Sequence, residues 1–155
     1  MRIAIGADHG GFTLKGEISE YIHQLGYEVS DFGINTPESV DYPDIAALVG
    51  KALQANQAER GILICGSGVG VCIAANKMVG VYAAICHDVY SARQGVEHDN
   101  MNVLCLGARV VGDELAKVLA KTFLEARFIG NDPGEERHLR RTKKIIKIEK
   151  RGFGK

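Results

Sequence analysis

Short apolar runs alternate along the chain with longer stretches in which apolar residues recur every three or four positions. The short runs are typical of buried parallel strands, and the longer spacing is typical of amphipathic helices. The pattern predicts strands at residues 2–7, 28–32, 61–65, 81–86 and 103–106. It predicts helices at residues 12–25, 42–56, 71–78, 89–97, 113–126 and 135–150. This alternation indicates an α/β fold, a single-domain, doubly wound (Rossmann-like) five-stranded parallel sheet flanked by helices.

The whole chain, residues 1–155, is expected to form one domain, since this length buries a core without disulfides or metals. Helical spacing also predicts which side chains face that core. In the helix at 113–126 the inward set is expected to be Leu115, Val118, Leu119, Thr122 and Phe123.

Composition favours a cytoplasmic protein with no membrane partner. Apolar residues make up 46% and charged residues 25% of the chain, and the apolar runs are only strand-length. The four cysteines form no C-x-x-C pair, which favours reduced thiols over disulfides or a zinc site.

The net charge is zero but unevenly distributed. From residue 135 onward there are nine Lys/Arg and three Asp/Glu, so this tail carries +6 and the rest −6. A basic tail can bind nucleic acid, but this one lacks interleaved aromatic residues and follows an acidic body. We therefore expect a phosphorylated small molecule as the partner, and no nucleic acid.

The strand at 61–65 ends in Cys65, and a glycine-rich loop follows at once, with the residues Gly66, Ser67, Gly68, Val69 and Gly70. Such a loop can turn backbone amides toward an anion. It matches neither the dinucleotide fingerprint, whose third glycine is replaced by Val71 or Ile73, nor the triphosphate loop. A tight turn beside a small buried cysteine would give the same pattern, so function stays open at this point.

Further polar residues stand near strand ends. Asp8 and His9 follow the first strand, Arg109 follows the fifth, and His98 with Asp99 comes just before the fifth. Arg137 and Arg141 are spaced i, i+4 and so share one face of the last helix. Each has an ordinary explanation as a helix cap or a solvated charge. Together they are expected to converge on the carboxyl edge of the sheet, where open α/β sheets bind ligands.

Six motifs spread over nearly the whole chain carry a resemblance. They are Gly6-Ala7-Asp8-His9-Gly10-Gly11, Val40-Asp41-Tyr42-Pro43-Asp44, Ile64-Cys65-Gly66-Ser67-Gly68-Val69-Gly70, Ala74-Ala75-Asn76-Lys77, Asn102-Val103-Leu104 and Gly107-Ala108-Arg109-Val110-Val111. In this order they resemble ribose-5-phosphate isomerase type B, whose family also contains galactose-6-phosphate and allose-6-phosphate isomerases.

The resemblance implies an aldose–ketose isomerase that works through an enediolate without metal or cofactor. It assigns Cys65 as the base that moves the proton between carbon 1 and carbon 2, and His98 as the acid that opens the sugar ring. Ser67 and the amides of residues 66–70 would bind the enediolate oxygens. A free thiol, with a pKa near 8.5, is only a few per cent thiolate at neutral pH, so such a base needs local help. The start of the following helix can supply some of it.

The resemblance also assigns substrate contacts and a partner. Asp8, His9 and Arg109 match substrate-binding positions, and Arg137 and Arg141 match the phosphate clamp. Asp99 stands where the family often has asparagine, which places a carboxylate acceptor beside the sugar. The family builds each site from two subunits, which implies a homodimer or a dimer of dimers. His98, Asp99 and Arg109 would then reach a neighbour's loop.

Three functions fit these observations. The first is interconversion of ribose 5-phosphate and ribulose 5-phosphate, and the second is the same chemistry on a six-carbon sugar such as allose 6-phosphate. The third is a non-catalytic phosphosugar-binding or flavodoxin-like module. The combination of Cys65, Ser67 and His98 counts against the third, because a binding module needs no thiol base.

Overall fold

The computed structural model describes residues 1–153, in which strands and helices alternate. The strands are β1 (Arg2–Ala7), β2 (Glu28–Asp31), β3 (Arg60–Cys65), β4 (Ala83–Ile85) and β5 (Val103–Gly107). The helices are α1 (Phe12–Gln24), α2 (Tyr42–Gln54), α3 (Val69–Ala75), α4 (Val89–Asp99), α5 (Asp113–Glu125) and α6 (Glu136–Phe153). No helix among these residues is long and apolar enough to cross a membrane.

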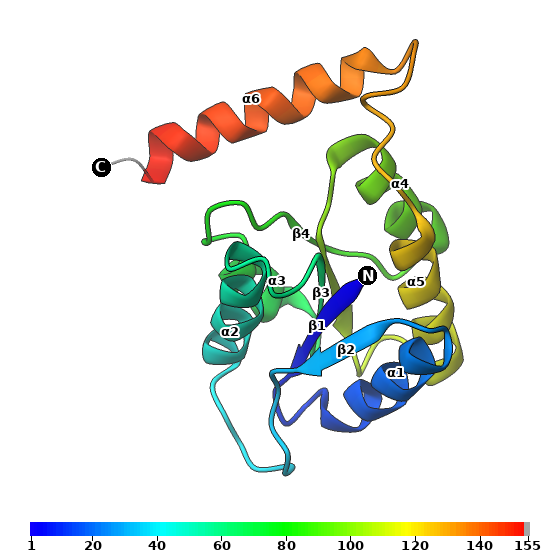
Figure 1. Ribbon diagram of the computed structural model, residues 1–155. Coiled ribbons are helices and arrows are strands. Elements are labelled where there is room, and N and C mark those ends of the chain that lie inside the picture. Colours follow the sequence, from blue (N-terminus) through cyan, green and yellow to red (C-terminus); the bar gives the residue numbers. More distant parts are fainter. Residues whose placement is uncertain (154–155) are drawn as a thin grey trace.

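The strands form one parallel sheet in the order β2-β1-β3-β5-β4. Figure 1 shows α2 and α3 on one face of the sheet and α1, α4 and α5 on the other. Each face has its own apolar core, because the central strands are buried on both sides. The predicted fold class is confirmed. The strand order reverses between β1 and β3. At such a switch point, the loops that follow these two strands lie on either side of a crevice.

Two sequence-based predictions need correction. β4 begins only at Ala83, since the amide of Tyr82 donates to the Asn102 side chain, 2.8 Å away, and it ends at Ile85, one residue before the predicted end. In α5, Leu115 and Val118 are 41% and 47% exposed, so they do not face the core as predicted. The buried face of α5 consists of Ala116, Leu119, Ala120, Thr122, Phe123 and Leu124.

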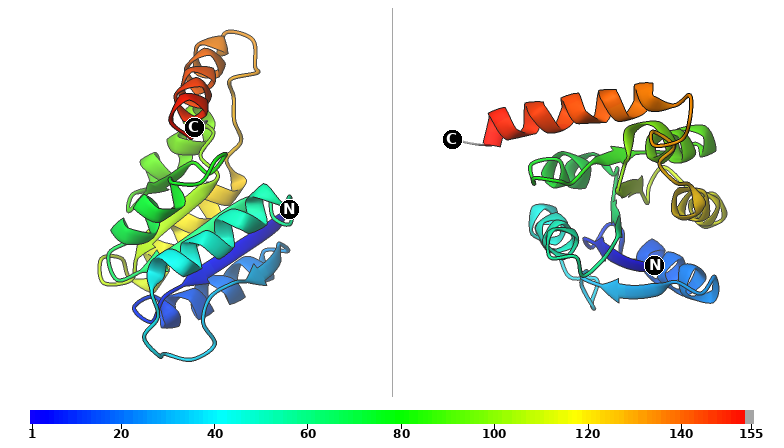
Figure 2. Two further views of the ribbon diagram at one scale, coloured as in Figure 1. Left: turned by 90° about the vertical axis from the view of Figure 1, so that its left-hand side faces the viewer. Right: turned by 45° about the horizontal axis from the view of Figure 1, so that its top comes forward.

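The last helix, α6, stands apart from the layered domain. It extends beyond α4 and past the β4 side of the sheet (Figures 1 and 2). Near its carboxyl end, Glu149 accepts a hydrogen bond from the amide of Gly80 (2.8 Å) and one from the hydroxyl of Tyr82 (3.4 Å). Near its amino end, α6 contacts α4.

A buried lysine fixes the loop between β2 and α2. Lys15 on α1 is 3% exposed, and its ammonium group donates to Asp31 Oδ2 at 2.6 Å and to the Ile34 carbonyl at 2.7 Å. A buried ammonium group needs such partners, because water cannot reach it. The ion pair thereby holds the start of the loop that leads to Tyr42.

Replacement of Lys15 by methionine is expected to lower the free energy of unfolding by about 1–3 kcal/mol, since it leaves a partly buried carboxylate and a carbonyl without their donor. Urea denaturation measures this loss. Lys51→Met, at an exposed lysine of α2, serves as the control and should change stability little. Equal midpoints for the two variants would show that the buried ion pair contributes nothing.

Candidate active site

The thiol of Cys65 lies at the carboxyl end of β3 and is held by the loop that follows. Cys65 is 5% exposed, and its Sγ accepts a hydrogen bond from the amide of Gly68 at 3.0 Å. Gly68 has a φ of 81°, a conformation that favours glycine, and α3 begins at the next residue. The Gly68 amide thus points its hydrogen at the sulfur atom of Cys65 and fixes the position of the thiol.

A cavity of about 380 Å³ opens above this thiol, at the switch point between β1 and β3. Its lining comprises Asp8, His9, Gly10, Tyr42, Cys65, Gly66, Ser67, Gly70, Arg109 and Val110. The structure therefore brings together the predicted residues that follow β1, β3 and β5. The cavity combines a thiol, a hydroxyl, a carboxylate and a guanidinium group.

Two of the loop amides expected to bind the enediolate are bonded within the loop itself. The Gly68 amide donates to Cys65, as described, and the Val69 amide donates to Ser67 Oγ at 3.2 Å. The Val69 side chain is 47% exposed. The loop thus uses these two amides to shape itself, and Ser67 presents its hydroxyl into the cavity from an exposed position.

Asp8 and Arg109 border the same cavity from opposite strands. Asp8 is buried, and its Oδ1 accepts a hydrogen bond from the amide of Gly11 at 3.1 Å, so it also shapes the turn into α1. A Cβ atom on Gly66 would lie 3.5 Å from Arg109 Nε. Arg109 therefore lines the cavity of its own chain, and its contact with a neighbour's loop stays a prediction.

Sequence reasoning assigned no role to two residues at this edge of the sheet. Tyr42, in one of the quoted motifs, packs so closely over Gly70 that a Cβ there would lie 2.7 Å from its ring. His87, two residues after β4, accepts the amide hydrogen of Gly107 at 3.0 Å through Nε2. His87 could have been found from the sequence, because it is a polar residue directly after the strand predicted at residues 81–86.

His98 and Asp99 lie elsewhere. They occupy the last turn of α4, and a helix that connects two parallel strands runs back from the carboxyl edge to the amino edge of the sheet. The expectation that they converge with Cys65 at the carboxyl edge is therefore wrong within one chain. β3 has six residues, so the two edges are about 20 Å apart.

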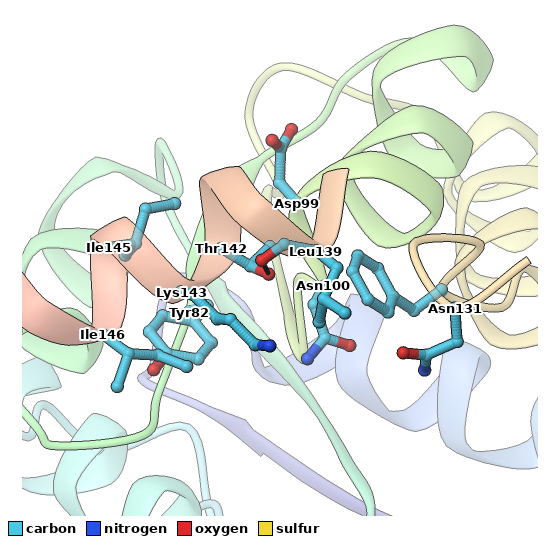
Figure 3. Close-up of a pocket in the computed structure, with 10 residues that line it drawn as sticks. Tyr82, Asp99, Asn100, Asn131, Leu139, Thr142, Lys143, Ile145 and Ile146 are labelled. Atoms are coloured by element: carbon cyan, nitrogen blue, oxygen red, sulfur yellow. Dashed lines mark hydrogen bonds between the residues drawn. The ribbon is translucent and has the colours of Figure 1, made fainter. Parts of the chain in front are cut away.

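A second cavity, of about 250 Å³, lies between α6 and this amino edge. Figure 3 shows Tyr82, Lys143 and Asn100 grouped beneath α6, with the carboxylate of Asp99 directed away from them. The predicted phosphate clamp is also on this side. Arg137 donates to the Gly134 carbonyl at 3.1 Å and pairs with Glu135 at 2.8 Å, and Arg141 is exposed.

The remaining cysteines lie outside the Cys65 cavity. The pKa of Cys72 is lowered to about 7, chiefly by a hydrogen bond with the thiol of Cys105, whereas burial raises the pKa of Cys86 to about 11. All four cysteines are free. Within residues 1–153, no three His, Cys, Asp or Glu side chains are grouped so that they could hold a metal ion.

Two comparisons of sequence bear on this site. The family model described as Ribose/Galactose Isomerase matches residues 3–145. Ribose-5-phosphate isomerase B of Escherichia coli is 44% identical over 150 residues, which are 97% of each chain. D-erythrulose-4-phosphate isomerase of Pectobacterium atrosepticum is 45% identical over 131 residues, or 84% of this chain and 86% of that protein.

Solved structures agree with the sequence comparisons. Ribose-5-phosphate isomerase B of Clostridium thermocellum superposes with a TM-score of 0.92 at 48% identity, covering 97% of this chain and 99% of that one. The enzyme of Mycoplasma genitalium with bound ribulose 5-phosphate gives a TM-score of 0.89 at 45% identity, covering 96% of each chain. The resemblance predicted from the motifs is thereby confirmed. The chain belongs to the ribose/galactose isomerase family and is a sugar-phosphate isomerase similar to ribose-5-phosphate isomerase B.

Proposed function

We propose that the protein interconverts ribose 5-phosphate and ribulose 5-phosphate through a cis-enediolate. The observation that carries the proposal is the Cys65 thiol, held by the Gly68 amide at the floor of the cavity, with Ser67 and Arg109 on its walls. This arrangement offers a base and groups that can stabilise an oxyanion on one side of a bound sugar.

In the proposed reaction the thiolate of Cys65 takes the proton from carbon 2 of the open-chain aldose. The electron pair of the broken C–H bond forms the C1–C2 double bond, and the carbonyl oxygen at carbon 1 becomes the enediolate oxygen. Transfer of the hydroxyl proton from O2 to O1, followed by return of the Cys65 proton to carbon 1, gives the ketose. Before this step the furanose opens: the bond between carbon 1 and the ring oxygen breaks, His98 gives a proton to the ring oxygen, and the C1 hydroxyl releases its proton to solvent as the carbonyl forms.

The choice of a five-carbon sugar rests on the extent of the sequence similarity. The 150-residue match to the Escherichia coli enzyme leaves at most five residues of this chain unaligned. It therefore includes most of α6, on which Arg137 and Arg141 stand. These arginines support the proposal because a guanidinium pair is well suited to bind a phosphate.

A four-carbon sugar phosphate is the second candidate, because the Pectobacterium relative named for D-erythrulose 4-phosphate is equally similar over 131 residues. The six-carbon alternative, allose 6-phosphate, differs from ribose 5-phosphate by one CHOH unit. An isomerisation assay on erythrose 4-phosphate, ribose 5-phosphate and allose 6-phosphate separates the three. We expect the highest kcat/KM on ribose 5-phosphate. A higher value on another sugar would replace the proposed substrate, and inactivity on all three would favour a binding module.

We further propose that a second copy of the chain completes the site. His98 and Asp99 are at the opposite edge of the sheet from Cys65, so they serve a Cys65 cavity only if that cavity belongs to another chain. Exposed apolar side chains are available for such contacts, among them Ile73 on α3, Val79 and Ile148 on α6, which are 58%, 50% and 70% exposed. The expected assembly is a homodimer or a dimer of dimers.

Mixing two inactive variants tests the shared site. Cys65→Ala and His98→Ala are each expected to be nearly inactive on ribose 5-phosphate. After unfolding and refolding of an equal mixture, half of the dimers contain one intact site, so activity should recover to about a quarter of that of the wild type. The variants refolded separately are the controls. If the mixture is no more active than the average of the two variants refolded separately, then His98 and Cys65 either belong to the same chain's site or do not share a site.

A further inference from the structure

The last two turns of α4 carry a cluster of hydrogen-bonding groups around His98. Gln94, one turn before His98, places its Nε2 atom 3.0 Å from His98 Nδ1 and 3.4 Å from Asp99 Oδ2. On the opposite side, the ring of His138 from α6 stacks on His98, with ring centroids 4.0 Å apart and planes 24° from parallel. His98 is thus held by one neighbour in its own helix and by one in α6.

The contacts of Gln94 determine which ring nitrogen of His98 carries the proton. An ionised carboxylate only accepts hydrogen bonds, so the end of the Gln94 amide that faces Asp99 must be the NH₂ group. The same NH₂ group faces His98 Nδ1 and can only donate to it. Nδ1 is therefore the acceptor, and the proton of the neutral imidazole is on Nε2.

His138 supports this arrangement without adding charge. It is 2% exposed, and burial is the main cause that lowers its pKa, followed by repulsion from the protonated form of His98 and from the charges of Arg137 and Arg141. Glu135, with Oε2 3.2 Å from His138 Nε2, opposes this shift. A neutral ring at this position presents a flat face that limits rotation of the His98 ring.

We propose that Gln94 is a positioning residue that holds His98 in the tautomer with its proton on Nε2, and that Asp99 keeps the Gln94 amide oriented for this task. The inference rests on the proposed function: the ring oxygen takes the Nε2 proton of His98 as the C1–O bond breaks, and the proton released by the C1 hydroxyl returns to Nε2 through solvent, so that His98 is neutral again. This inference gives the proton-donating nitrogen, and it gives Asp99 a role beside the sugar contact implied by the resemblance. An asparagine at position 99 could donate as well as accept, so it would not fix the amide in the same way.

Nitrogen-15 NMR of the histidine rings of the free protein at a pH where His98 is neutral tests the tautomer directly, without substrate. In the wild type, His98 should carry its proton on Nε2. Gln94→Leu should give a mixture of both tautomers, and Gln94→Glu should move the proton to Nδ1, because a carboxylate accepts. Gln24→Leu is the matched control, since Gln24 lies at the end of α1 and its side-chain amide donates to Glu20 in its own helix. A wild type with its proton on Nδ1, or an unchanged tautomer in both Gln94 variants, would overturn the proposal.

Kinetics supply the second readout. Gln94→Glu should lower kcat on ribose 5-phosphate by about 100-fold, a loss no larger than that seen in other enzymes whose catalytic histidine is held in the wrong tautomer. It should leave KM nearly unchanged. Turnover of erythrose 4-phosphate, which needs no ring opening, should stay near the wild-type value. Equal losses on both sugars would contradict a role through His98. If the wild type isomerises neither sugar, the proposed function fails while the NMR result on the tautomer still stands.

Discussion

Replacement of Cys65 by alanine is expected to lower kcat by about 10³-fold, within the range that general acid–base groups contribute. KM should change little, because the base acts in the transition state of proton transfer, whereas ground-state binding of the sugar phosphate depends on other groups. The geometric reason is that Cys65 is the cysteine that lines the cavity, with its sulfur bonded to the Gly68 amide. Steady-state kinetics on ribose 5-phosphate measure both constants.

Cys72→Ala is the matched control. The pKa of Cys72 is lowered to about 7, chiefly by a hydrogen bond with the thiol of Cys105. Cys72 donates to the Ala83 carbonyl at 3.5 Å and lies outside the Cys65 cavity. Its replacement should leave kcat within about twofold of the wild type, as for a residue that touches no reacting atom. If Cys65→Ala were fully active and Cys72→Ala inactive, the catalytic base would be Cys72 on α3.

The fold was predictable because its signals are local. β1, β3 and β5 are continuous apolar runs that end in polar or glycine-rich loops, and a strand buried on both faces has that composition. The start of β4 was not predictable, because the bond between the Tyr82 amide and the Asn102 side chain depends on residues far apart in the chain. Leu115 and Val118 fit the helical period equally well whether that face meets the core or remains exposed.

The site was predictable only in part, for a topological reason. Residues directly after strands meet at one edge whatever the strand order, so Asp8, Cys65 and Arg109 could be grouped from sequence. His98 comes before a strand, at the end of a helix, and the direction of that helix places it at the opposite edge. The contact between His98 and His138 could not be predicted, because it depends on where α6 packs.

The substitution His98→Asn is expected to affect substrates according to whether they cyclise. Ribose 5-phosphate is mostly a furanose in solution, so the enzyme must open the ring before Cys65 can act. In erythrose 4-phosphate the oxygen on carbon 4 carries the phosphate, and no five-membered ring can close. A variant that lacks the ring-opening acid should therefore be slow on the first sugar and nearly normal on the second.

We expect His98→Asn to lower kcat/KM for ribose 5-phosphate by about 100-fold, the lower end of what a general acid contributes, and that for erythrose 4-phosphate by less than about threefold. Asparagine keeps a polar group of similar reach beside Gln94, so α4 should retain its structure. Circular dichroism and the unfolding midpoint check this. Equal losses on the two sugars would mean that His98 orients the substrate and donates no proton to the ring oxygen. The acid would then have to be sought among the groups that line the Cys65 cavity, where Asp8 and His9 are the candidates.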